Sequence, residues 1–243
     1  MSACNPPPEL WICHLGTVPY REALNIQARI RTRRLAGELP DVLLLLEHPP
    51  TYTVGRRAGA GELPLGEDFY RAQGIEIMAT DRGGRVTYHG PGQLVGYPII
   101  RVQDVVGHVR ALETALVAAL ADEGISAHSR TAEGPDFTGV WVAERKIASI
   151  GVHVSRAVAT HGFAVNVDND LEPFSWIVPC GLAGVQMTSV ARELLRGVPT
   201  ASAQCPSLER FGACVRERLC ERLEHMGREV GMEELGIAMA VPA

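Results

Sequence analysis

Two residues of this chain stand out by their chemistry, Lys146 and Cys180. Lys146 is the only lysine among 23 basic residues, and Cys180 lies between Pro179 and Gly181. Arginine is effectively always protonated, whereas a lysine amine can release and recover a proton. A cysteine thiolate is a nucleophile, and a nearby cation raises the fraction of the thiol that is ionised. The pair could therefore supply a nucleophile and a proton carrier, although composition alone slightly favours an accidental lysine in an arginine-biased chain.

The other cysteines and histidines show no pattern that is typical of a metal site. The sequence has no C-x-x-C pair and no Cys/His ladder with zinc spacing. Cys13 and His14 are neighbours in an alternating stretch and should point to opposite faces of a strand. We therefore expect no metal and no cofactor. His89 and His153 are candidates for a pocket, whereas packing or surface roles are expected for His48, His108, His128 and His225.

A glycine-rich segment, residues 82–98, is a second candidate site. It reads RGGRVTYHGPGQLVGYP and contains five glycines and two prolines. Glycines let backbone N–H groups approach a ligand closely, and polar side chains can orient that ligand. The segment is neither a Walker loop nor a dinucleotide fingerprint, because it lacks both glycine spacings. Residue chemistry alone leaves two possibilities open, a ligand-binding loop and a tight crossover between two strands.

The hydrophobic pattern predicts the elements that must position these residues. Period-two runs and buried apolar runs indicate strands at 10–15, 41–50, 75–81, 94–102, 126–130, 138–144, 146–155 and 161–167. Amphipathic patterns indicate helices at 19–39, 69–73, 105–123, 189–197 and 207–227. Residues 51–68 are predicted to form a long loop and residues 82–93 a turn system. The pattern predicts an α+β fold with a mixed β-sheet flanked by helices.

No linker or repeat divides the chain, so we expect one catalytic domain over residues 1–243. Within it, residues 1–9 are expected to form a flexible Pro-rich tail and residues 228–243 a tail of unknown role. The net charge of −5 gives no general attraction to nucleic acid or to an anionic membrane. The N-terminal residues show neither the basic nor the apolar region of a signal peptide. We therefore expect a cytoplasmic protein with reduced thiols and no nucleic-acid or membrane partner.

Five motifs in a fixed order carry a family resemblance. They are the segment 82–98, then KIASIG from Lys146, HGFAVN from His161, PCGL from Pro179, and TSV from Thr188. Together they resemble the octanoyltransferases of lipoate biosynthesis, which move octanoyl from acyl carrier protein to a lysine of a lipoyl domain. The resemblance spans most of residues 10–195. Leu182 stands where isoleucine is commoner in the family, and no motif matches beyond Gly227.

The resemblance implies the fold of the biotin and lipoate protein ligases, with Cys180 as the acyl-carrying nucleophile and Lys146 as its acid/base partner. The substrate-binding residues that it implies form three groups: Arg82, Gly83, Gly84, Arg85, Val86, Thr87, Tyr88 and His89; Ser149, Ile150 and Gly151; Gly162, Phe163 and Ala164. The implied partners are acyl carrier protein, the lipoyl domains of 2-oxoacid dehydrogenase complexes and the glycine cleavage H protein. A monomer is expected. Two alternatives are an ATP-dependent lipoate or biotin ligase and a non-catalytic acyl-binding module.

This chemistry gives a reason for a single lysine among arginines. An ammonium can promote thiolate formation and protonate a leaving thiol, and the resulting amine can then accept a proton from an attacking lysine. A guanidinium could do only the first of these. An acidic carrier protein also calls for a local basic dock, for which the candidates are Arg56, Arg57, Arg82, Arg85 and Arg145. Candidate oxyanion donors are the backbone near Cys180 and Gly181, and the side chain of His89.

Overall fold

The computed structural model describes residues 6–179, 184–196 and 205–237, so Cys180 and its neighbours Gly181 and Leu182 lie outside the described residues. The strands are β1 (Glu9–Thr17), β2 (Asp41–Glu47), β3 (Thr51–Val54), β4 (Glu76–Ala79), β5 (Val86–His89), β6 (Gln93–Ile99), β7 (His128–Ser129), β8 (Gly139–Val142), β9 (Arg145–Ser155), β10 (Val158–Asn166), β11 (Gln186–Met187) and β12 (Met226–Glu229). In the described part of the chain the α-helices are α1 (Tyr20–Ala36), α2 (Glu67–Ala72), α3 (Val105–Asp122), α4 (Val190–Leu194) and α5 (Leu208–Leu223), and the short 3-10 turns are η1 (Thr131–Glu133), η2 (Pro135–Phe137) and η3 (Glu172–Trp176).

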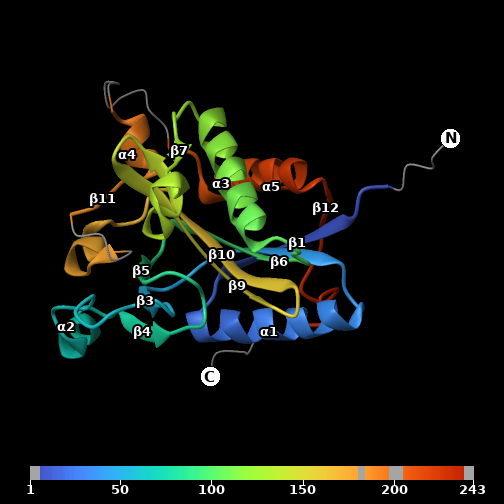
Figure 1. Cartoon of the computed structure of the whole chain (residues 1–243), viewed down its shortest axis with the longest axis horizontal. Helices are drawn as coiled ribbons and strands as arrows, with labels where there is room; N and C mark the ends of the chain where they lie inside the picture. The colour runs from blue at the N-terminus through green and yellow to red at the C-terminus, as the bar shows by residue number, and fades with distance from the viewer. Residues whose placement is uncertain (1–5, 180–183, 197–204, 238–243) are drawn as a thin grey trace.

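A large mixed sheet forms the centre of the molecule (Figure 1). Within the described part of the chain its strand order is β12-β1-β2-β6-β10-β9-β8-β7, and β11 pairs with the beginning of β9. β1 runs parallel to both β12 and β2, whereas the pairs from β2 to β7 along this order are antiparallel. A smaller sheet has the order β4-β3-β5. The mixed α+β architecture predicted from the sequence is therefore confirmed.

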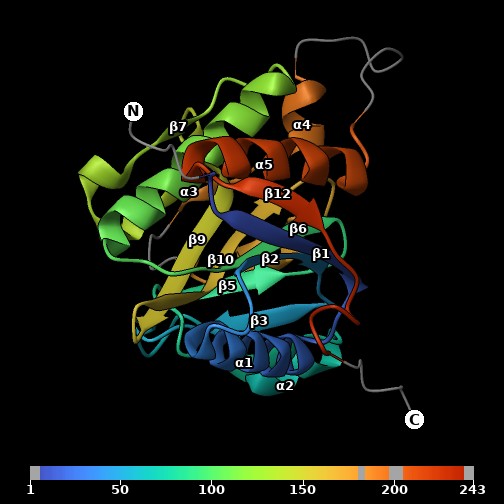
Figure 2. The same cartoon turned by 90° about the vertical axis from the view of Figure 1, so that its right-hand side faces the viewer.

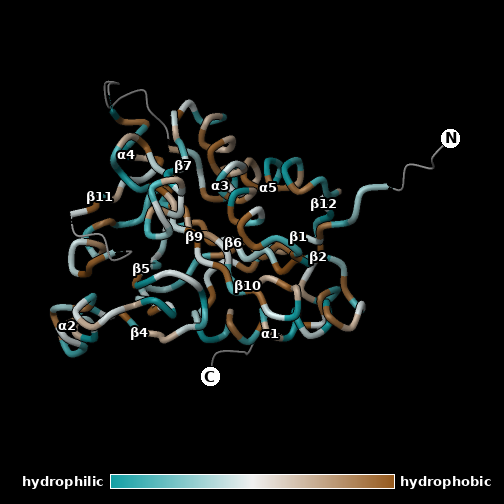
Figure 3. Tube along the Cα trace, viewed as in Figure 1, coloured by the Kyte–Doolittle hydropathy of each residue, from teal (hydrophilic) through white to brown (hydrophobic). Residues whose placement is uncertain are grey.

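Helices cover both faces of the large sheet, α3 and α5 on one face and α1 on the other (Figure 2). Leu112, Leu116 and Leu120 of α3 belong to a cluster of buried side chains that includes α5 and one face of the strands. Ile26 and Ile30 of α1 belong to the cluster on the opposite face. Hydrophobic residues accordingly concentrate in the sheet and on the inner sides of the helices (Figure 3). The start of α3 is less buried than its later turns, because the side chain of Val106 is exposed.

The small sheet corrects two expectations. Residues 51–54 form a strand within the predicted loop 51–68, and residues 86–89 form a strand within the predicted turn system. Both runs are only four residues long and stand beside glycines, so the density of turn residues concealed their alternation. β5 pairs antiparallel with β3, opposing Val86 to Val54. This sheet carries the segment 82–87 to the side of β9.

The C-terminal part of the chain also differs from the prediction. The helix expected over 207–227 ends at Leu223, and residues 226–229 form β12 beside β1. The proposed tail 228–243 therefore begins inside a strand, and Leu235 beyond it is fully buried against the α1 side of the sheet. At the other end of the chain, β1 begins at Glu9, the last residue of the predicted tail 1–9.

Candidate active site

A cavity of about 420 Å³ lies where the small sheet meets β9 and β10 of the large sheet. Lys146 contributes to its wall, together with all but one of the residues that the resemblance assigned to substrate binding. These residues come from the turn 82–84 and β5, from β9, and from β10. The turn is fastened to β9 by a hydrogen bond from the Gly83 N–H to the Val152 carbonyl oxygen at 3.0 Å. Segments distant in sequence thus meet around one space.

Tyr88 is the predicted substrate-binding residue that does not line this cavity. Its side chain is buried on the other face of β5, where its ring centroid lies 5.5 Å from those of Tyr52 and Phe174. Successive residues of a strand point to opposite faces, and Thr87 and His89 occupy the cavity side. Tyr88 therefore belongs to the core of the small sheet.

Lys146 is 1% exposed and lies at the beginning of β9. Its Nζ is 5.3 Å from the centroid of the Trp141 ring. A Cβ atom added to Gly139 would lie 2.8 Å from the lysine Cε and 3.4 Å from Nζ, so the lysine stem passes over this glycine. Gly139 has a φ of +134° and is held by a 2.9 Å hydrogen bond from its N–H to the buried carboxylate of Glu113. The lysine position is thus defined by tight packing.

The described residues on either side of Cys180 are attached to the same region. The N–H of Val178 donates to the backbone oxygen of Glu62 at 3.1 Å, two residues before Cys180. On the other side, Met187 of β11 pairs with Lys146, and the Thr188 N–H donates to the Lys146 carbonyl oxygen at 2.9 Å. The chain therefore leaves the Glu62 loop, passes residues 180–183, and returns beside Lys146.

The side chain of Arg82 stabilises the glycine-rich turn of the site. Its side chain donates to the backbone oxygens of Gly83, Thr53 and Arg85 at 3.0, 2.6 and 2.7 Å, and also to the Thr53 hydroxyl. These contacts fold the glycine-rich turn around one guanidinium. Because Arg82 is only 7% exposed, it does not belong to an exposed docking surface, contrary to the prediction from the sequence.

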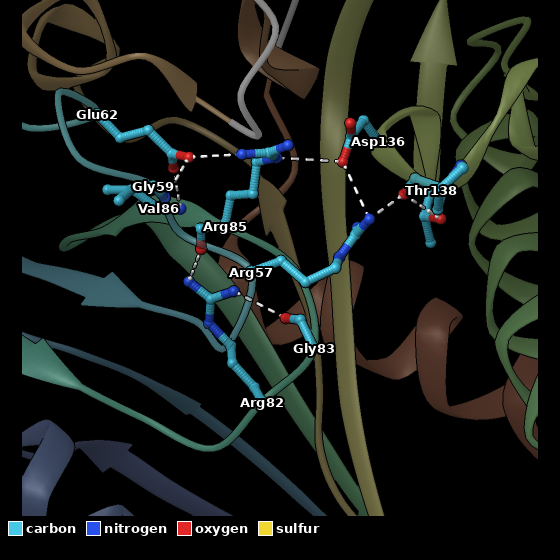
Figure 4. A network of polar contacts seen from close by, with 10 residues as sticks. Arg57, Gly59, Glu62, Arg82, Gly83, Arg85, Val86, Asp136 and Thr138 are labelled. Carbon is cyan, nitrogen blue, oxygen red and sulfur yellow. Dashed lines mark hydrogen bonds and ion pairs between the residues drawn. The ribbon is translucent and has the colours of Figure 1, made fainter.

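A chain of ion pairs spans the cavity wall (Figure 4). The buried carboxylate of Glu62 accepts from Arg85 at 2.9 Å and from the Val86 N–H at 3.1 Å. Arg85 also contacts Asp136 at 3.3 Å, and Arg57 contacts the same carboxylate at 3.2 Å. These carboxylates raise the pKa of Arg85 above its ordinary value, Glu62 having the largest effect. The network links the small sheet to the loop that carries η2.

The remaining dock candidates, Arg56, Arg57 and Arg145, differ in how far they are exposed. Arg145 forms a two-point ion pair with Glu193, with both N–O distances at 2.9 Å. Arg56 is exposed, and Arg57 keeps 43% of its side chain exposed. Of the five candidates, Arg56 and Arg57 are therefore the most accessible to a partner. His153 does not line the cavity and instead lies 3.6 Å from Asp81.

Two buried histidines are held in defined tautomers, His89 in the cavity wall and His48 behind it. His89 Nδ1 donates to the Gln93 side-chain oxygen at 2.8 Å, and its Nε2 accepts from the Thr53 hydroxyl at 3.3 Å. His48 Nδ1 donates to the Val18 carbonyl oxygen at 2.6 Å, and its Nε2 accepts from the Tyr97 hydroxyl at 2.7 Å. Burial lowers the pKa of His48 to about 4 and that of His89 well below its ordinary value, so both are neutral. With both ring nitrogens engaged, His89 is a poor oxyanion donor.

Three polar residues of the cavity wall were not predicted as site residues from the sequence: Tyr20, Tyr97 and His161. The Tyr20 hydroxyl lies 3.5 Å from His161 Nδ1, and His161 Nε2 lies 2.7 Å from a carboxylate oxygen of Asp81. Burial is the largest influence on the pKa of His161 and lowers it, while Asp81 acts in the opposite direction. Tyr20 begins a helix and Tyr97 lies in an apolar strand, so each resembled a core residue. Only His161 could have been recognised as a site residue from the sequence, because it lies in the HGFAVN motif.

Within residues 6–179, 184–196 and 205–237, no cluster of three His, Cys, Asp or Glu side chains could hold a metal ion. In the same ranges, no helix is sufficiently long and apolar to cross a membrane.

Comparison with known proteins identifies the class to which this fold and site belong. Residues 19–211 match the family described as the lipoyl protein ligase A/B catalytic domain. A lipoate protein ligase from Thermoplasma acidophilum superposes with a TM-score of 0.70 at 18% identity, covering 94% of this chain and 90% of that one. A lipoate-protein ligase A bound with ATP gives a TM-score of 0.67 at 17% identity, covering 95% and 92%. The chain has the biotin/lipoate ligase fold and is a member of the lipoyl protein ligase A/B family.

The sequence relatives assign the chain to one group of enzymes within this family. An octanoyltransferase from Acidothermus cellulolyticus is 48% identical over 200 residues, which cover 79% of this chain and 85% of the relative. Another, from Rubrobacter xylanophilus, is 48% identical over 193 residues, covering 78% and 86%. The chain belongs to the octanoyltransferases within that family.

Proposed function

We propose that this protein transfers an octanoyl group from octanoyl-acyl carrier protein, through a thioester on Cys180, to the lysine of a lipoyl domain. The observation that carries the proposal is the buried Lys146, which lines the same cavity as the glycine-rich turn and lies beside the chain that returns from Cys180. The names of the sequence relatives support the acyl group and the type of reaction. We further propose that the enzyme acts as a cytoplasmic monomer.

The first half-reaction forms the acyl-enzyme. The Cys180 thiolate attacks the carbonyl carbon of the donor thioester, forming a new C–S bond and a tetrahedral intermediate. The intermediate collapses with cleavage of the C–S bond to the pantetheine thiol. The ammonium of Lys146 donates a proton to that leaving thiolate and becomes a neutral amine. One thioester replaces another, so the step requires no external energy source.

The second half-reaction releases the product. The amine of the acceptor lysine attacks the Cys180 thioester, a C–N bond forms, and the C–S bond to Cys180 breaks. The neutral amine of Lys146 takes the proton that the attacking nitrogen loses, which restores the ammonium beside a thiolate. A guanidinium at this position would remain protonated throughout and could not accept that proton.

The decisive experiment is mass spectrometry after incubation with octanoyl-acyl carrier protein. We expect one octanoyl group on the peptide that contains Cys180, and its disappearance when lipoyl domain is added. The Cys180→Ala variant should remain unlabelled, whereas Cys214→Ala, which changes a cysteine on α5 away from the cavity, should label as the wild type does. An octanoyl adduct at another residue with Cys180 unmodified would refute the proposed nucleophile.

The same assay tests the ATP-dependent alternative. A ligase of this fold would form product from free octanoate or lipoate only in the presence of ATP, and its Cys180→Ala variant would remain active. We expect the opposite result on both counts. An acyl-binding module without catalytic activity would bind the donor but transfer nothing to the lipoyl domain.

A further inference from the structure

One end of the cavity is polar, although most of its wall is apolar. Tyr20, Tyr97 and His161 are each no more than 3% exposed and lie together there. The ring centroids of Tyr97 and His161 are 6.3 Å apart, and the Tyr20 hydroxyl lies 3.5 Å from His161. On the α3 side of the sheet, Val105 and Val106 line the cavity while remaining 44% and 59% exposed. The three polar residues therefore form a buried polar part of the wall, which we call the end wall.

The strand register gives the distance from Lys146 to this end wall. The lysine Nζ lies beside Gly139, and Gly139 pairs with Ser149 of β9. His161 pairs with Val152, three residues further along the same strand. Three residues of a β-strand span about 10 Å. The reactive end of the cavity and the end wall are therefore separated by about 10 Å along β9.

An eight-carbon acyl chain fits this length. Seven C–C bonds, each advancing an extended chain by about 1.3 Å, place the terminal methyl roughly 9 Å from the carbonyl carbon. A thioester held beside Lys146 would thus bring that methyl against the end wall. Two further methylenes would have to press against hydroxyl and imidazole groups that already bond to one another, to His48 and to Asp81, and that offer no apolar surface to them.

We propose that Tyr20, Tyr97 and His161 determine acyl chain length by presenting a polar surface to the end of an octanoyl chain. This inference rests on the proposed function and identifies the residues that select its acyl group. Selection is then chemical as well as steric. A chain that ends in a hydroxyl should be tolerated better than an all-carbon chain with the same number of atoms.

The test compares kcat/KM for octanoyl, nonanoyl, decanoyl and 8-hydroxyoctanoyl groups on acyl carrier protein. The variants are Tyr20→Leu, which opens the wall, and Tyr20→Phe, which removes only the hydroxyl. Burial of a methylene in an apolar site is worth about fourfold in binding, so Tyr20→Leu should raise the decanoyl-to-octanoyl ratio by up to about 15-fold. Tyr20→Phe should raise it by about fourfold. In the wild type, 8-hydroxyoctanoyl should be used better than nonanoyl.

Tyr52→Phe is the matched control, since Tyr52 is buried outside the cavity and its hydroxyl donates to the Pro173 carbonyl oxygen at 2.6 Å. Its decanoyl-to-octanoyl ratio should equal that of the wild type. An unchanged ratio in folded Tyr20→Phe and Tyr20→Leu proteins would overturn the inference, as would a preference of the wild type for nonanoyl over 8-hydroxyoctanoyl. A wild-type protein that transfers no octanoyl group at all would instead refute the proposed function.

Discussion

Substituting Gly139 by alanine would test whether the placement of Lys146 governs catalysis. The new Cβ would lie 2.8 Å from the lysine Cε, where ordinary contacts are 3.4–4 Å, and it would overlap the carbonyl oxygen of Ala148. The lysine stem must then move by roughly 0.6–1.2 Å, and displacements of about 1 Å in an active site can cost about 100-fold in rate. The φ of +134° adds about 1–3 kcal/mol of backbone strain for any residue with a side chain.

We therefore expect kcat to fall by about 100-fold and the free energy of unfolding by about 1–3 kcal/mol. The assay is single-turnover octanoylation of Cys180, measured at a temperature where circular dichroism shows the variant to be folded. Gly37→Ala provides the control, because Gly37 also has a positive φ, of +76°, but a Cβ there would meet nothing within 4 Å. It should lose stability and keep its rate. A folded Gly139→Ala protein with a rate within about threefold of the wild type would refute the reasoning.

Three further predictions concern charge. Lys146→Arg should unfold in a single cooperative transition yet lose at least about 100-fold in multiple-turnover transfer, and near-normal turnover would remove the acid/base role. Arg57→Glu should raise KM for octanoyl-acyl carrier protein several-fold at low salt, with the difference shrinking as salt is added; a salt-independent KM would exclude Arg57 from docking. Hydrogen bonding to Asp41 raises the pKa of His225 above 6.5, so its stabilising contribution is full below pH 6.5 and is lost as pH rises through that raised pKa. Urea unfolding of the wild type and His225→Asn should therefore differ more at pH 6 than at pH 8.5, and equal differences would contradict the assignment.

Much of the fold was accessible from the sequence because its pattern is strong. The apolar run over 41–46 and the stripe through Leu112, Leu116 and Leu120 correspond to elements of the core. The strands over 51–54 and 86–89 were concealed by flanking glycines and prolines. β12 could not be predicted from the sequence for another reason. Its partner β1 lies more than 200 residues away, and residues 226–229 are all exposed. Such a strand exists through its pairing and has no hydrophobic pattern of its own.

The same contrast holds for the candidate site, where some residues could be assigned from sequence motifs and others only from the structure. Residues within ordered motifs could be assigned together, and the structure brings Lys146, Ser149 and Gly162 to one cavity. The type of a residue could not show which partners its side chain would bind. Arg82 resembled a docking arginine, yet its donors hold the turn that contains it. Tyr20 resembled a helix residue facing the core, and only the tertiary fold places its ring beside His161.

The short strand β12 also protects the protein against association. Without it, β1 would present the unpaired N–H and C=O groups of a nine-residue strand along the border of the sheet, a template for pairing with a second chain. β12 occupies four positions of that border and presents charged residues, including Arg228 and Glu229, to solvent. Arg216 of α5 pairs with Glu229 and holds the strand in place. A change that unpairs β12 should therefore appear as concentration-dependent self-association through the exposed border of β1.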